Sequence, residues 1–429
     1  MNAINERLLE LEATGKPVML GLIGAGQMGQ EILCQVQLMK GLRIPLLVDI
    51  TWERAELACH MARIPADRVE RVETPEAAKR AVAAGRMAVA IDWRIATSLD
   101  CIQTIVDATG SPELGVSIAL ECIRAKKHIV MMNVECDVTV GLILNRMARE
   151  AGVIYTLAAG DEPAAIVELW RFATALGFEI VAAGKGKNNP LDITATPDSL
   201  AERAKARDMS ARMLCEFVDG SKTAVEMCSV ANATGLKPDV RGMHGARATR
   251  DTLHQVFCPK SQGGVLNHAG AVDFAIGVHP GVFVAFTTDQ PRLRHGLIQR
   301  DMGNGPNYLL FRPYHLCSIE VPLTAAQAVI YGESGGHPLP RPVAECLAIA
   351  KRPLKAGQTL DAIGEYCYRG SIDTAEAARR DNLLPLGLAK GCTLGRDVAV
   401  GEPIRYADLA ELPDTALTRL RKRQDQTCQ

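Results

Sequence analysis

The sequence predicts an α/β protein built on a doubly wound parallel sheet, and two observations support this fold class. Short apolar segments alternate with helical patterns through the N-terminal part of the chain. The first apolar segment, Val18 to Ile23, runs directly into a glycine-rich turn. Strands that alternate with helices of about ten residues or more form parallel, doubly wound sheets.

Each predicted element follows from its own residue pattern. Leucines among charged residues predict a short helix over residues 2–14, which ends at Gly15. The strands are short apolar runs, as expected for strands buried on both faces. Strands are expected at 18–23, 44–49, 88–92, 104–108, 128–132, 153–157 and 179–183, and further helices at 30–39, 54–62, 77–84, 113–125 and 164–176.

The turn after the first strand carries a dinucleotide-binding fingerprint: Gly24, Ala25, Gly26, Gln27, Met28 and Gly29. Gly24 permits the tight turn, and Gly26 lets the backbone approach a pyrophosphate. Gly29 allows the helix to pack closely on the strand, so that its N-terminal N–H groups and dipole face the phosphates. This arrangement predicts a Rossmann domain that binds NAD or NADP.

The residue that meets the adenosine ribose is expected at the end of the second strand. Asp49 lies there, 20 residues after Gly29. A carboxylate at this place accepts hydrogen bonds from the ribose hydroxyls and favours NAD. Arg54 follows closely and would favour NADP by meeting a 2′-phosphate, or is a solvated helix residue. The choice between NAD and NADP stays open.

Polar residues also follow the strands at 104–108 and 128–132. Thr109 and Gly110 come after the former strand, and Asn133 after the latter. Because ligands bind at the carboxyl ends of strands in such sheets, we expect these residues on the nicotinamide side. The alternative is that they are ordinary loop residues.

The residue pattern changes twice along the chain and predicts three domains. Residues 1–155 are expected to form the nucleotide-binding domain, and residues 156–345 a catalytic and oligomerisation domain of α+β type, in which residues 184–320 are rich in Gly, Asn and His. Residues 346–429 carry a short internal repeat, KRPLKAGQTL at 351–360 and RDVAVGEPI at 396–404. The repeat predicts a small β-rich module with two related halves. The last nine residues are expected to form a frayed tail.

Composition excludes several classes of protein. The 48 basic and 49 acidic residues leave no overall field that would attract nucleic acid or a membrane. No apolar run is long enough for a membrane span, and residues 1–16 do not resemble a signal peptide. The 13 cysteines, an odd number without C-x-x-C pairs, indicate free thiols and a cytoplasmic protein.

Two groups of residues are candidates for the chemistry. Asp161 and Glu162 stand in a turn before Pro163, where they would bind a divalent metal or polar substrate or relay a proton, or simply start a helix. Residues 184–190, GKGKNNP, predict a flexible cationic loop in which Lys185, Lys187 and Asn189 contact a carbonyl or anionic group. The alternative is a plain solvent-exposed turn.

The glycine loop, the VDATGS segment and the KKHIVMMNVE segment resemble the homoserine-dehydrogenase-type NAD(P)-binding family, and the C-terminal repeat resembles a SAF (β-clip) module. The whole arrangement resembles the bacterial group described as 1-deoxy-D-xylulose-5-phosphate reductoisomerase-like. One departure is clear: Val134 stands where homoserine dehydrogenases carry a catalytic lysine after the asparagine. The resemblance therefore places the active site at Asp161, Glu162 and residues 185–189.

The resemblance implies an NAD(P)H-dependent oxidoreductase that reduces a small polar carbonyl compound, with phosphorylated compounds among the candidates and a divalent metal as an optional cofactor. A reductoisomerase-like reaction is the specific hypothesis. The alternatives are a simple dehydrogenase of a hydroxy acid or polyol, and a non-catalytic sensor of the NAD(P) redox state. We expect a homodimer or larger homo-oligomer.

Overall fold

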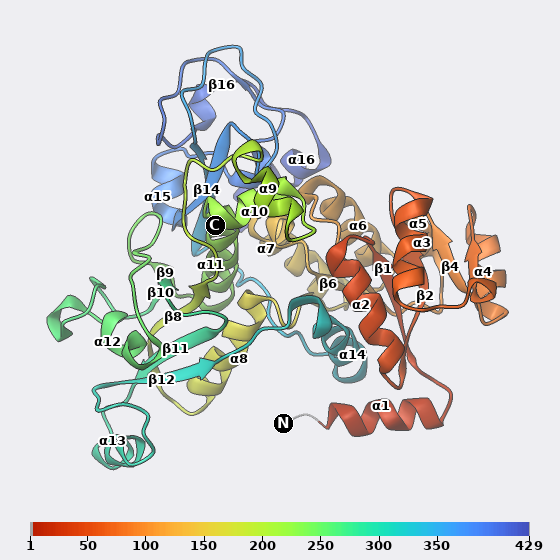
Figure 1. Ribbon diagram of the computed structural model, residues 1–429, viewed down its shortest axis with the longest axis horizontal. Coiled ribbons are helices and arrows are strands. Elements are labelled where there is room, and N and C mark those ends of the chain that lie inside the picture. Colours follow the sequence, from red (N-terminus) through yellow and green to blue (C-terminus); the bar gives the residue numbers. More distant parts are fainter. Residues whose placement is uncertain (1–2, 429) are drawn as a thin grey trace. The chain divides into compact units, whose positions relative to one another are not determined.

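A computed structural model describes residues 3–428, and the chain divides into two compact units (Figure 1). The first unit comprises the chain up to Ala164 together with Leu316–His337. The second comprises Ala165–His315 and the chain from Pro338 onward. The three-domain division at 155/156 and 345/346 stays a prediction.

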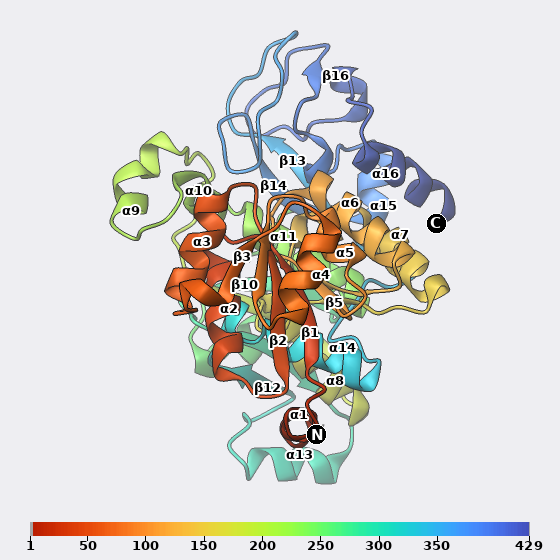
Figure 2. The same cartoon turned by 90° about the vertical axis from the view of Figure 1, so that its right-hand side faces the viewer.

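The first unit is built on a seven-stranded parallel sheet, which confirms the predicted fold class. Its strands are arranged in the order β3-β4-β2-β1-β5-β6-β7. Strand β1 lies between β2 and β5, and Figure 2 shows these strands side by side. The strands are β1 (Val18–Ile23), β2 (Leu42–Val48), β3 (Val69–Arg71), β4 (Met87–Ala90), β5 (Thr104–Asp107), β6 (His128–Met131) and β7 (Tyr155–Leu157).

Helices connect these strands as the alternating pattern predicts. They are α1 (Ile4–Ala13), α2 (Gln27–Leu38), α3 (Trp52–Met61), α4 (Pro75–Ala83), α5 (Arg94–Ser98), α6 (Pro112–Arg124), α7 (Val134–Ala151) and α8 (Glu162–Ala175), which runs into the second unit. The predicted start of the first helix, Asn2, lies outside the described residues. The long helix α7 was not predicted, because residues 134–145 are buried on all sides and exposed polar residues are confined to its C-terminal end.

A late segment of the chain completes the core of this unit. Helix α14 (Val321–Tyr331) buries Val321, Ala325 and Ala326 in the same apolar cluster as Leu20 and Ile32. The turn after β7 is tied to this segment, because Ala159 donates its backbone N–H to the Thr324 hydroxyl at 2.8 Å.

The second unit contains a mixed five-stranded sheet in the order β12-β11-β8-β10-β9. Its strands are β8 (Glu179–Lys187), β9 (Lys237–Pro238), β10 (Ala271–Ile276), β11 (Val282–Thr287) and β12 (Asn307–Arg312). The helices before Pro338 are α9 (Ala201–Lys205), α10 (Ala211–Val218), α11 (Ser221–Thr234), α12 (Leu253–Val256) and α13 (Pro291–Ile298).

The prediction of a flexible loop over residues 184–190 is wrong for its first half. Residues 184–187 belong to β8 and pair with β10, and Gly184 and Lys185 also pair with β11. The two glycines serve close packing: a Cβ at Gly184 would lie 2.1 Å from the Asp273 carbonyl oxygen, and one at Gly186 would lie 1.4 Å from that of Val278. Glycine in a strand allows this approach of another backbone segment.

The C-terminal segment is rich in short β structure, as the internal repeat predicts. It contains β13 (Ala344–Ala350) paired with β14 (Tyr368–Thr374), β15 (Thr393–Leu394) paired with β16 (Leu409–Glu411), and helices α15 (Ala375–Arg380) and α16 (Ala416–Thr427). The two repeats meet at equivalent positions, because Leu354 and Val398 exchange backbone hydrogen bonds of 2.9 and 3.0 Å. Its assignment as a SAF module stays a prediction.

The frayed C-terminal tail is not observed for the described residues. Helix α16 continues to Thr427, and its Arg421 makes a buried ion pair with Glu345 of β13. Gln429 lies outside the described residues. All thirteen cysteines are described and none forms a disulfide. No described helix has both the length and the hydropathy needed to cross a bilayer.

Candidate active site

The glycine loop between β1 and α2 has the close contacts that its fingerprint requires. Gly24 has a φ of +108°, and a Cβ there would lie 2.6 Å from the Ala108 carbonyl oxygen. A Cβ on Gly29 would lie 1.9 Å from the Gly24 carbonyl oxygen. At Gly26, by contrast, a Cβ would meet no described atom within 4 Å. The first and last glycines therefore shape the loop, whereas Gly26 borders open space.

Gly26 is also the N-cap of α2 and has no side chain to accept hydrogen bonds from the first turn of the helix. Gln27 and Met28 begin that turn, and Ala25 directly precedes the cap. The N-terminal N–H groups of a helix carry a partial positive charge and bind anionic oxygens. The loop therefore offers a cradle of the kind that fits a pyrophosphate.

Asp49 lies next to this cradle. The residue is 9% exposed, and its carboxylate accepts hydrogen bonds from the backbone N–H groups of Ala25, at 2.7 Å, and Ile50, at 2.8 Å. A carboxylate has about four acceptor positions, so Asp49 can accept further hydrogen bonds from a ribose. Arg54 is an exposed residue in the first turn of α3.

Thr109 and Asn133 are joined through a residue that the sequence did not single out. Asp107, at the end of β5, accepts from the Thr109 hydroxyl at 2.6 Å and from the Asn133 amide at 3.1 Å. Burial raises the pKa of Asp107. Asn133 also caps α7, because its side-chain oxygen accepts from the Cys136 N–H. These contacts hold the loops after β5 and β6 together, and Gly110 stands in the former with a φ of +63°.

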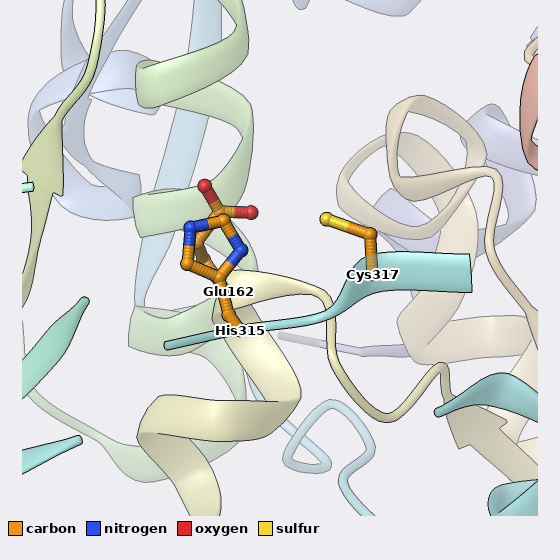
Figure 3. A group of neighbouring side chains, drawn as sticks. All are labelled: Glu162, His315 and Cys317. Carbon is orange, nitrogen blue, oxygen red and sulfur yellow. The ribbon is translucent and has the colours of Figure 1, made fainter. Parts of the chain in front are cut away.

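Asp161 and Glu162 lie in the turn between β7 and α8, in the first unit. Both are buried, with exposed fractions of 8% and 5%. The turn packs against the segment after Leu316, because Gly160 accepts a hydrogen bond from the Cys317 N–H at 2.9 Å. A Glu162 oxygen and the Cys317 sulfur lie within 4.8 Å of each other. Figure 3 shows the Cys317 sulfur pointing toward Glu162.

Carboxylate, thiolate and imidazole groups are the ligands that divalent transition metals use in proteins. Glu162 and Cys317 of the first unit supply two such groups. Figure 3 also draws His315, which precedes Cys317 by two positions in the sequence and ends the first of the two stretches that form the second unit. The donor types therefore fit a transition metal better than Mg²⁺, which prefers oxygen ligands.

Strand β8 places Lys185 and Lys187 on one face of the sheet in the second unit, because alternate residues of a strand share a face. Both are buried, with exposed fractions of 7% and 6%. Lys185 makes an ion pair with Glu226 of α11, whose side chain is 2% exposed. A buried ammonium group requires such a partner.

Lys187 has no carboxylate partner among the described residues and donates instead to the Phe217 carbonyl oxygen at 2.7 Å. Burial and then the neighbouring Lys185 lower the pKa of Lys187 to about 8. Lys187 lines a pocket of about 320 Å³ in the second unit. Asn189 lies beyond the strand and accepts from Arg203, at 2.6 Å, and Arg207.

Sequence reasoning missed the acidic partners of this region. Glu226 lies 41 residues after Lys185 on an almost fully buried helix, where no local pattern relates the two. Asp219 is likewise fully buried and pairs at 2.6 Å with Lys351, the first residue of the repeat. The only signal in the sequence was the type of residue. A charged residue among apolar residues of a buried segment is expected to have a partner of opposite charge, because such residues are rarely buried unpaired.

The middle of the chain matches a known protein family. Residues 160–321 match the family described as "Oxidoreductase DRL, catalytic domain". The matched region contains Lys185, Lys187 and Glu226 as well as the turn at Asp161 and Glu162. This match identifies the chain as an oxidoreductase. No curated protein matches the sequence.

Several solved structures are similar to the chain at low sequence identity. A probable dehydrogenase from Thermotoga maritima is 12% identical, with a TM-score of 0.41 over 74% of this chain and 91% of that one. A levoglucosan dehydrogenase in complex with NADH and levoglucosan is 14% identical, with a TM-score of 0.41 over the same shares. An NAD-binding oxidoreductase from Klebsiella pneumoniae is 19% identical, with a TM-score of 0.30, and the match spans 42% of this chain and 44% of that one.

Proposed function

We propose that the protein is an NAD(P)H-dependent reductase of a small, polar carbonyl compound. The observation that carries this proposal is the glycine loop, in which two glycines are required by contacts and the third borders open space at a helix N-terminus. The match to an oxidoreductase catalytic domain over residues 160–321 supports the same conclusion.

The residues of the loop fit the cofactor. The pyrophosphate would lie on the N–H groups at the start of α2, beside Gly26, and the adenosine ribose at Asp49. Arg54 would meet a 2′-phosphate if the cofactor is NADP, and the residues around Thr109 and Asn133 would border the nicotinamide. A bound, reduced nicotinamide supplies a hydride to the carbonyl carbon.

The protein must then supply a proton to the carbonyl oxygen, and Lys187 is suited to this. Its ammonium lines a pocket, and its lowered pKa of about 8 lies near physiological pH. A general acid acts best when its pKa is near the working pH. We propose that Lys187 stabilises the developing alkoxide and donates its proton, while the pair of Lys185 and Glu226 keeps the strand's second ammonium in place.

The specific form of the reaction that we favour is reductoisomerase-like, and a simple hydroxy-acid or polyol dehydrogenase is the alternative. Lys187, a buried lysine that lines a pocket and has a lowered pKa, supports catalysis over a purely sensing role, because a sensor needs no group with a shifted pKa. We propose Asp161 and Glu162 as polar or metal-binding residues of the same enzyme, with Glu162 and Cys317 as the donors.

Steady-state oxidation of NADPH in the presence of 1-deoxy-D-xylulose 5-phosphate tests the reductoisomerase-like reaction. Oxidation of small hydroxy acids and polyols with NADP and NAD tests the simple dehydrogenase. Lys187→Met and Asp161→Ala should each lower turnover, whereas Lys355→Met, at an exposed position, should not. Absence of NADPH oxidation with the sugar phosphate would exclude the reductoisomerase form. Unchanged turnover in both site variants would refute the assignment of the active site.

A further inference from the structure

The pocket that contains Lys187 is formed by residues far apart in the sequence. Lys187 comes from β8, and Gly220 and Thr223 come from the start of α11. The C-terminal segment contributes Arg369 and Ser371 from β14. The pocket of about 320 Å³ is at the lower end of the roughly 300–1,000 Å³ that small-molecule sites occupy. It therefore suits a small compound.

The charges that line this pocket are positive. Its lining includes Lys187, Arg241 and Arg369 and no acidic residue. Arg241 is already balanced, because it pairs with Asp373 at 2.6 Å and with Asp381 at 2.9 Å.

The nearest carboxylates of the surrounding elements are also engaged. Asp219 pairs with Lys351 at 2.6 Å and accepts from the Ser221 N–H at 2.8 Å. Glu226 pairs with Lys185. Within residues 3–428, neither Lys187 nor Arg369 makes an ion pair. Two cations of the pocket therefore have no directly contacting carboxylate, and the charge of Asp219, already paired with Lys351, acts on both only through space.

Arg369 is only partly satisfied by hydrogen bonds. Its guanidinium has five N–H donors, and the described structure shows one bond, to the Gly370 carbonyl oxygen at 3.1 Å. Burial lowers the pKa of Arg369, which reflects the cost of its charge in this place. A half-buried arginine held at such a cost favours an anionic oxygen ligand, which it can bind with two parallel hydrogen bonds.

Two hydroxyl groups of the pocket also lack protein partners. Ser371 is 6% exposed and Thr223 is 4% exposed. No hydrogen bond of either hydroxyl is found within the described part of the chain. Buried hydroxyls are normally hydrogen-bonded, to protein, to water or to a ligand. Both hydroxyls can donate to an anionic oxygen.

We infer that this pocket binds the oxyanion of a small anionic compound, a carboxylate or phosphate, between Arg369, Ser371 and Thr223, with Lys187 at the group to be reduced. The C-terminal segment thereby completes the substrate site of the second unit. Placing the reacting group at Lys187 rests on the proposed function, whereas the binding of an oxyanion by Arg369 does not.

Calorimetric titration of the full chain with inorganic phosphate, with malonate and with neutral ethylene glycol tests the inference at pH 7 and low ionic strength. Phosphate, malonate or both should bind at one site, and ethylene glycol should not. Binding of phosphate alone assigns a phosphorylated compound, and binding of malonate alone assigns a carboxylic acid. Arg369→Gln should weaken binding at least about tenfold, because it removes a charge-assisted hydrogen-bond donor.

Arg352→Gln is the matched control, because Arg352 is an exposed residue of the same segment outside the pocket, and it should bind like the wild type. Melting temperatures in anion-free buffer exclude misfolding: Arg369→Gln should be at least as stable as the wild type, since it removes an unbalanced charge. Absence of binding by both anions, or equal binding by wild type and Arg369→Gln, would overturn the inference.

The two proposals fail separately. If NAD(P)H does not bind but phosphate or malonate still binds through Arg369, the proposed reductase function is wrong and the oxyanion site stands. If NAD(P)H binds and is oxidised with a substrate, but neither anion binds, the oxyanion site is wrong and the reductase function stands.

Discussion

Two glycines of the same loop should respond to alanine in opposite ways. At Gly26 a Cβ meets no described atom within 4 Å, and the residue's φ of −68° suits any L-amino acid. At Gly29 a Cβ would lie 1.9 Å from the Gly24 carbonyl oxygen. Backbone cannot move aside as a side-chain end does, so Gly29→Ala must separate α2 from the loop.

The magnitudes follow from this contrast. Gly29→Ala should lower the free energy of unfolding by about 3 kcal/mol, the upper end of typical overpacking costs. Gly26→Ala should leave stability within about 0.5 kcal/mol, because alanine at a compatible φ even restricts the unfolded chain. The added methyl group would instead occupy the space where a pyrophosphate approaches, and should weaken NAD(P)H binding at least tenfold, about 1.4 kcal/mol.

Urea unfolding followed by circular dichroism measures the first quantity, and titration with NADPH and NADH measures the second. The three tryptophans give a fluorescence signal for the titration. If Gly26→Ala binds both cofactors like the wild type, the open space beside Gly26 is not a cofactor site. If Gly29→Ala is as stable as the wild type, the close contact in the loop is wrong.

Three further predictions concern charge and capping. Glu226→Gln should lower the free energy of unfolding in urea by about 3–5 kcal/mol, because it removes one partner of a buried ion pair. The control Asp397→Asn, at an exposed ion pair, should lower it by less than about 1 kcal/mol. Equal costs would contradict the buried pairing. The free energy of unfolding of the wild type minus that of Lys187→Met should increase by up to about 3 kcal/mol from pH 8 to pH 10.5. In this range the folded protein has already lost the Lys187 proton, which the unfolded chain still binds. A difference that does not change with pH would refute the lowered pKa of about 8. Asn133→Ala should cost about 1–3 kcal/mol through the lost cap of α7 and the lost bond to Asp107, and a variant as stable as the wild type would show that this network contributes nothing.

The first unit was predictable from the sequence because its signals are local. Strand β1 was predicted with its observed bounds, since an apolar run ends directly at the glycine turn. One local signal of the second unit was equally informative: the internal repeat predicted β structure, and Leu354 and Val398 pair with each other at equivalent positions of its two halves. In each case neighbouring residues carry the information.

The second unit was less predictable because its interactions join distant residues. The glycines and lysines of residues 184–187 have the composition of an exposed turn, yet they form the inner strand β8. The two lysines can be buried in this strand because Lys185 pairs with Glu226 and Lys187 donates to the Phe217 carbonyl oxygen. Neither partner is near in sequence. The contribution of Arg369 to the same pocket could not be inferred from its own surroundings in the chain.

The central claim is that the loop from Gly24 to Gly29 binds a nicotinamide dinucleotide. The most direct test is a titration of the purified full chain with NADPH and with NADH, followed by tryptophan fluorescence or heat. We predict saturable binding of at least one of them, with the ratio of the two affinities showing whether Asp49 or Arg54 governs the ribose end. Binding of neither would contradict the account, because the glycine loop would then be only a turn.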